Sequence, residues 1–114
     1  MVKNSSKITK VSELLIKELK KYDLRVKYLI LYGSYASNRQ RKDSDIDLAV
    51  ISPDFPSKSI VKKQEFLGDA IFNIKEPIEP IGYTLTEYYN CEKGSFLDEI
   101  KRTGKIIYSN PKVK

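Results

Sequence analysis

Apolar side chains recur every three or four residues near the start of the chain, which is the spacing of one helix face. They are Val11, Leu14, Leu15, Leu19 and Tyr22. We therefore predict an amphipathic helix over residues 9–22, capped by Thr9, with lysines on its outward side.

Two short apolar runs follow this helix. Residues 26–32 are mostly β-branched, aliphatic or aromatic and end at Gly33, which is typical of a buried strand. Residues 46–51 form the second run. Between the two runs, the small and polar residues 34–40 predict a short helix, which a basic loop follows. The pattern predicts two buried strands joined by a polar connection.

The second half of the chain contains residues that start and stop helices. Ser59 is placed to cap a helix that reaches about Phe72. Ser95, with Asp98 three residues later, is placed to cap a last helix. We expect Gly104 to end that helix in the left-handed conformation.

Two more strands are predicted in this half, with a short helical turn at 86–90 between them. Residues 78–85 read as a strand, but Pro80 cannot donate to a ladder, so this strand should lie at an edge or contain a bulge. Residues 105–108 form a short final strand. Helices that alternate with strands predict an α/β (α+β) fold with a mixed sheet of about four strands.

The chain has 114 residues, the length of one typical domain. We expect a single domain over residues 1–114 with frayed ends at 1–8 and 109–114. No apolar run approaches a membrane span, and the first residues lack the apolar stretch of a signal peptide. The single Cys91 cannot form an internal disulfide, which fits a reducing compartment. We therefore expect a cytoplasmic protein.

Composition excludes several kinds of chemistry. The chain contains no histidine, so it cannot supply a Ser-His-Asp triad, a histidine base or a mixed Cys-His zinc site. Any metal site must use carboxylates, which favours Mg²⁺ or Mn²⁺. The 21 basic and 15 acidic residues give a net charge of +6, which favours anionic partners such as nucleotides, nucleic acid or an acidic protein.

Two aspartates at the start of the second strand are the leading candidates for chemistry. Asp45 and Asp47 are two residues apart, so strand alternation places both carboxylates on one face, roughly 6–7 Å apart. Two such charges repel unless a cation lies between them. A Mg²⁺ ion that carries a triphosphate would meet this need. Upstream, Gly33 allows close backbone approach, and Ser34 stands where amide donors and a hydroxyl would meet phosphate.

The segments Leu31–Ala36 and Asp43–Val50 resemble the Gly-Ser and paired-Asp motifs of the DNA polymerase beta-like nucleotidyltransferases, at that family's spacing. Within this superfamily the chain is most similar to the small stand-alone minimal nucleotidyltransferases of the antitoxin type. The segment from Phe96 to Tyr108 is also similar to the end of these domains. The resemblance covers nearly the whole chain.

The resemblance implies metal-dependent transfer of a nucleoside monophosphate, AMP from ATP or another nucleotide, to an acceptor hydroxyl with release of pyrophosphate. Asp45 and Asp47 would hold one or two ions, and Gly33 and Ser34 would position the phosphates. A third carboxylate is implied on a neighbouring strand, and our candidate is Glu79, with Glu76 as the alternative.

Three basic residues between the two motifs, Arg39, Arg41 and Lys42, are candidates to bind the triphosphate. The resemblance also implies a helical HEPN-type toxin as the partner, with a toxin tyrosine as the acceptor and this chain as the antitoxin.

The sequence departs from the family pattern in two places. Glu79 stands where Asp is usual, beside Pro80, and Ser37–Asn38 replaces the usual Arg-Gly, so the loop cannot use a glycine there. These departures leave open an antitoxin subunit that binds nucleotide or partner without turnover. A third hypothesis, a basic nucleic-acid module, rests only on the net charge.

Overall fold

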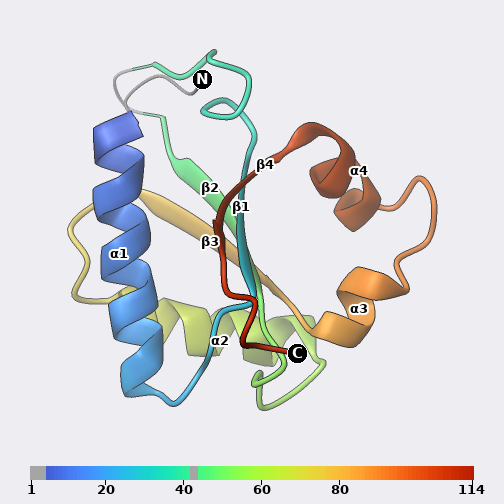
Figure 1. Ribbon diagram of the computed structural model, residues 1–114. Helices are drawn as coiled ribbons and strands as arrows, with labels where there is room; N and C mark the ends of the chain where they lie inside the picture. Colours follow the sequence, from blue (N-terminus) through green and yellow to red (C-terminus); the bar gives the residue numbers. More distant parts are fainter. Residues whose placement is uncertain (1–4, 42–43) are drawn as a thin grey trace.

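The computed structural model describes residues 5–41 and 44–114, and they form a four-stranded mixed sheet with helices on both faces (Figure 1). The strands are β1 (Tyr28–Tyr32), β2 (Ile46–Ile51), β3 (Ile78–Tyr83) and β4 (Lys105–Ser109). Their order is β3-β2-β1-β4, with β2 and β3 parallel and the other pairs antiparallel. The predicted mixed α/β (α+β) sheet of about four strands is confirmed, and β3 lies at an edge, as Pro80 required.

The long helices α1 (Ser5–Lys21) and α2 (Ile60–Ile71) cover one face of the sheet, and the short helices α3 (Leu85–Tyr89) and α4 (Phe96–Thr103) lie on the other (Figure 1). Strand alternation explains these two layers. Leu29, Leu31, Leu48 and Val50 point into a large core beneath α1 and α2. Their neighbours Ile30, Ala49 and Ile51 pack with Ile100 of α4 in a smaller cluster.

The predicted helix caps at Ser59 and Ser95 are both present, since each side chain accepts a hydrogen bond from a backbone N–H three residues later. Thr9 is not a cap, because α1 already begins at Ser5. Gly104 does end α4, but in an extended conformation at φ −80°, so the predicted left-handed stop is wrong. A side chain there would meet the Ile100 carbonyl oxygen at 2.5 Å, so close packing requires the glycine.

Regular elements extend into both of the expected end segments. Residues 5–8 belong to α1, whose Ile8 is buried. At the other end, Ser109 belongs to β4 and the Val113 side chain is 2% exposed. Residues 5–8 and Ser109 thus lie within regular elements, and residues 1–4 lie outside the described part. The expected fraying at 1–8 and 109–114 stays a prediction. No helix within the described ranges is long and apolar enough to cross a membrane.

Candidate functional site

Asp47 of β2 and Glu79 of β3 share the face of the sheet that carries α3 and α4, and Asp45 lies just before β2. Ile46 and Leu48 point into the core under α1, so Asp47, which lies between them, faces the opposite way. Asp45 precedes β2 by one residue and is exposed. In the parallel pair of β2 and β3, Glu79 lies directly opposite Asp47. The pairing of the strands thus brings Glu79 beside the two predicted aspartates.

The surroundings of Asp47 disfavour its negative charge. Burial raises the pKa of Asp47, and repulsion from Asp45 and from Glu79 raises it further. Among the described residues, none of these three carboxylates has a lysine or arginine within ion-pair distance. A cation would offset this repulsion, and carboxylate oxygen donors suit a hard divalent ion.

As they stand, the three side chains do not converge on one point. Nowhere in residues 5–41 and 44–114 do three His, Cys, Asp or Glu side chains form a group ready to hold an ion. Asp45 and Glu79 are exposed, so both have room to turn toward Asp47. The donor chemistry therefore fits Mg²⁺ or Mn²⁺, and ion binding would require these side chains to move together.

Glu76, the alternative third carboxylate, is engaged elsewhere. Its carboxylate lies 3.9 Å from the Lys7 ammonium at the start of α1. It is also absent from the groups that shift the pKa of Asp47, whereas Glu79 is among them. The structure thus places Glu79, and not Glu76, beside the aspartates.

Gly33 makes room for the Asp47 carboxylate. It ends β1 at a positive φ of 73°, the left-handed region that disfavours other residues. A Cβ atom at this position would overlap Asp47 Oδ2 and would lie 3.2 Å from Cγ. The glycine of the Gly-Ser motif is therefore needed both for the turn and for the position of the aspartate.

Residues 33–38 form consecutive turns, so the predicted short helix at 34–40 is wrong. Hydrogen bonds close the turns, including one from the Arg39 N–H to the Ser34 carbonyl at 2.8 Å. Ser34 therefore stands in a turn and not at a helix N-terminus. Asn38 adopts φ 58°, the conformation that glycine would take, and asparagine tolerates this region better than most residues. The absence of the family's glycine is thus accommodated.

A cavity of about 630 Å³ lies between this turn and α4. Its walls include Gly33, Ser34 and Arg39 from the turn and Phe96 and Glu99 from α4. Arg39 thus lies where it could contact a ligand next to the Gly-Ser motif. Arg41 is exposed and is not part of this wall, and Lys42 lies outside the described residues.

Tyr32 links the cavity to the carboxylates. It lies opposite Asp47 across β1 and β2 and also lines the cavity, where its ring meets the edge of Phe96. Burial, followed by the charge of Asp47, raises the pKa of Tyr32 to about 12. Its hydroxyl therefore stays protonated at neutral pH and remains a hydrogen-bond donor beside the acidic cluster.

Sequence reasoning missed the contribution of α4 to this cavity. Phe96 and Glu99 are three residues apart and so share one helix face, and Phe96 is half exposed. An apolar residue directly after a helix cap was the available signal. Only the packing of α4 against β1 shows that this face borders the Gly-Ser turn.

Comparison with known proteins supports the family indicated by the motifs. The family model for polymerase beta nucleotidyltransferases matches residues 13–113. A structure from Sulfolobus solfataricus described as a "putative nucleotidyltransferase" is similar with a TM-score of 0.63 and 14% identity, over 90% of this chain and 80% of that one. A chain from a toxin-antitoxin structure with AMP-PNP gives a TM-score of 0.54 and 19% identity, over 88% and 74%. No curated protein matches the sequence.

Proposed function

The chain belongs to the polymerase beta nucleotidyltransferase family, and from this premise we propose that it transfers a nucleoside monophosphate from a nucleoside triphosphate, ATP in the first instance, to an acceptor hydroxyl. The observation that carries the proposal is the register of β2 and β3, which sets Glu79 opposite Asp47. Asp45 and the Gly33 turn lie next to this pair. The acidic residues and the Gly-Ser turn thus meet at one end of the sheet.

The proposed reaction is an in-line displacement at the α-phosphorus. The acceptor oxygen forms a bond to this phosphorus, and the bond from the phosphorus to the oxygen that leads to the β-phosphate breaks. Pyrophosphate leaves, and the acceptor proton passes to solvent or to a carboxylate of the site. A Mg²⁺ or Mn²⁺ ion bound by Asp45, Asp47 and Glu79 would neutralise charge on the phosphates and on the entering oxygen.

The residues of this chain would bind and orient the nucleotide. The backbone and hydroxyl of Ser34 and the guanidinium of Arg39 are available to the phosphates at the turn. Tyr32 offers a protonated hydroxyl between the cavity and Asp47. Positioning of the reactants and charge neutralisation would provide most of the rate enhancement.

The acceptor is proposed to be a hydroxyl on a partner protein. The likeness to a chain from a toxin-antitoxin structure supports a partner of this kind, and we propose a helical HEPN-type toxin with a tyrosine acceptor. The chain would then act as the antitoxin, which inactivates its toxin by covalent modification.

A second candidate function is nucleotide or partner binding without turnover. The observation that favours it is the failure of the three carboxylates to converge within the described part of the chain. Glu79 is also one methylene longer than aspartate and stands beside Pro80 on an edge strand.

Labelled nucleotide distinguishes the two functions. The chain is incubated with Mg²⁺, its candidate partner and ATP labelled at either the α- or the γ-phosphate. Transfer predicts that the partner retains the α label but not the γ label, and that Asp47→Asn abolishes labelling. Asp69→Asn is the matched control, because Asp69 is an exposed acid on α2. Unchanged labelling by Asp47→Asn would refute the metal assignment, and no transfer at all would favour the binding function.

A further inference from the structure

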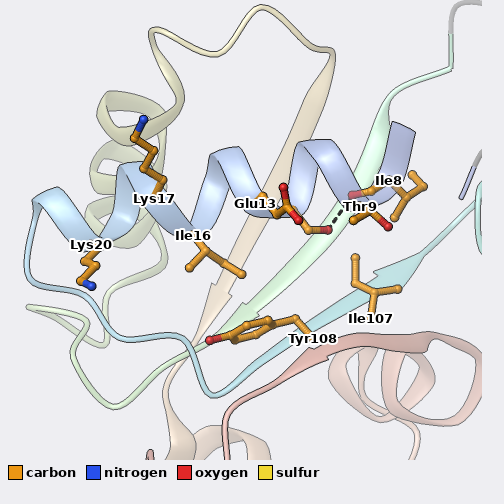
Figure 2. A pocket seen from close by; sticks show the side chains of 9 residues that line it. Ile8, Thr9, Glu13, Ile16, Lys17, Lys20, Ile107 and Tyr108 are labelled. Carbon is orange, nitrogen blue, oxygen red and sulfur yellow. Dashed lines mark hydrogen bonds between the residues drawn. The ribbon is translucent and has the colours of Figure 1, made fainter. Parts of the chain in front are cut away.

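An apolar groove runs along α1 beside the edge strand β4 (Figure 2). Ile107 and Tyr108, which line it, pack on the α1 side of the sheet, the face away from the carboxylates. The groove encloses about 680 Å³. Thr9, Ser12 and Ile16 line it from α1, and Ile107 and Tyr108 line it from β4. The Ser12 hydroxyl donates a hydrogen bond to the Ile8 carbonyl at 2.7 Å, so this hydroxyl already has a partner within α1.

A bulge in β4 gives the groove its floor. Tyr108 pairs with Leu29 and Ile106 pairs with Ile30, which leaves Ile107 as an extra residue between the two pairs. As a result, the consecutive side chains Ile107 and Tyr108 both pack against the core on the α1 side. Ile106 points to the other face and is 53% exposed.

The groove is long enough for several turns of helix. A second depression of about 490 Å³ shares Ile16, Lys20 and Tyr108 with the first and extends it to Val26. From Ile8 to Lys20 the helix axis advances roughly 18 Å, at about 1.5 Å per residue. A partner helix of three to four turns would match this length.

The rim of the groove is basic toward the end of α1. Lys17 and Lys20 line the groove and are exposed, and neither forms an ion pair within the part of the chain that the structure describes. Glu13 lies on the same rim, nearer the start of the helix (Figure 2). Carboxylates on an occupant would therefore find complementary charge beside Lys17 and Lys20.

The same features disfavour two other occupants. An added β-strand would have to pair along β4, where the bulge at Ile107 interrupts the regular edge. A second copy of this chain would bring its own α1 to the groove, and the outward side of α1 carries Lys10, Lys17, Lys20 and Lys21. Two such surfaces would repel one another.

From these features we propose that the groove between α1 and β4 binds an acidic amphipathic helix of a partner protein. Its apolar face would cover Ile16, Ile107 and Tyr108, and its carboxylates would lie beside Lys17 and Lys20. The groove and the carboxylate site lie on opposite faces of the sheet, so the two can be occupied together. The proposal does not depend on the transferase activity.

The test uses the whole chain and a designed peptide in the absence of nucleotide. The probe is a fluorescent peptide of about 16 residues, roughly 24 Å as a helix, with leucines on one face and glutamates beside them. A scrambled peptide of the same composition is the control. Binding is measured by anisotropy, and the contact surface is mapped by amide NMR shifts. We expect shifts along α1 and β4 and no comparable binding of the scrambled peptide.

Two matched pairs of variants locate the binding surface. Lys17→Glu/Lys20→Glu should weaken binding about tenfold at low salt, since two rim attractions become repulsions, whereas Lys62→Glu/Lys93→Glu changes the net charge equally and should have no such effect. Ile107→Ser should also weaken binding, and its neighbour Ile106→Ser should not. If Ile107→Ser fails to fold, the lysine pair still decides the outcome.

Several results would overturn the proposal. These are the absence of peptide binding at the highest soluble concentration, equal binding of the scrambled peptide, and shifts that map to another face. A dimer of the chain in sedimentation that Ile107→Ser dissociates would also overturn it, because a second copy would then fill the groove. None of these results bears on transfer of label from ATP, so the two proposals fail separately.

Discussion

The replacement of Gly33 by alanine tests the role assigned to the Gly-Ser turn. Gly33 has φ 73°, and an alanine Cβ there would overlap the Asp47 carboxylate. The left-handed conformation costs a non-glycine residue about 1–2 kcal/mol. The overlap itself is relieved if the Asp47 side chain turns away, so it should add little to the loss of stability. It should, however, displace the central carboxylate of the site.

Gly94 provides the matched control. It has φ 85°, and a Cβ there would meet nothing within 4 Å. Gly33→Ala and Gly94→Ala should therefore lose similar stability, about 1–2 kcal/mol in urea unfolding. For a chain of this size the melting temperature should fall by about 4–8 °C. Both variants introduce the same backbone strain, but only Gly33→Ala should displace the Asp47 side chain.

Binding of nucleotide separates the two variants. Titration calorimetry with ATP and Mg²⁺ should show wild-type affinity for Gly94→Ala and at least about tenfold weaker affinity for Gly33→Ala, a loss of about 1.4 kcal/mol. The pKa of Asp47, followed by carboxyl ¹³C NMR, should change only in Gly33→Ala. Equal nucleotide affinity of the two variants would refute the reasoning, because Asp47 would then not need the space beside Gly33.

Three further predictions concern charged groups. Burial and neighbouring carboxylates raise the pKa of Asp47. The native state therefore binds a proton at the Asp47 carboxyl more tightly than the unfolded chain does, so ionisation of Asp47 destabilises the fold. In metal-free buffer, Asp47→Asn should therefore unfold at higher urea concentration than wild type at pH 7, and the difference should vanish below the ordinary value of 3.8. For Glu87, burial alone would raise the pKa, but the hydrogen bond from the buried Lys63 at 2.6 Å contributes to a net lowering. Glu87→Gln should lower the free energy of unfolding by about 2 kcal/mol at pH 7. This loss should disappear as the pH falls below 4.5, the ordinary pKa of a glutamate, and through the lower pKa of Glu87 in the folded state. A urea midpoint of Glu87→Gln equal to wild type at pH 7 would contradict this role. Arg25 holds Asp54 through two side-chain hydrogen bonds at 2.8 and 2.9 Å on the surface, so Asp54→Asn should cause a small loss of stability that high salt removes.

Local signals in the sequence were sufficient for most of the secondary structure. The strand at residues 46–51 was predicted with the bounds that the structure shows, because its apolar run is bordered by polar residues. Ser59 and Ser95 cap helices as predicted, since a cap depends on residues only three positions apart. The helix predicted at 34–40 is wrong, and turns at 33–38 take its place, because small polar residues are compatible with both structures.

Residues distant in sequence were harder to place. Lysine side chains are rarely buried, yet that of Lys63 is 2% exposed, and Glu87 of α3 pairs with it. Gly104 reads as a left-handed stop, yet its lack of a side chain serves the approach of Ile30 on β1. In both cases the deciding contact comes from another element of the fold, so the local sequence pattern does not predict it.

The sequence by itself determined the candidate chemistry of this protein. The absence of histidine left carboxylates as the candidate donors to any metal ion, and the spacing of Asp45 and Asp47 at the start of a strand predicted that both share one face. The tertiary structure decided what surrounds them. Strand pairing set Glu79 opposite Asp47, packing brought α4 to the Gly-Ser turn, and the bulge in β4 turned both Ile107 and Tyr108 toward the groove beside α1. Side-chain spacing within one element follows from neighbouring residues in the sequence, whereas strand register and packing depend on the whole folded chain.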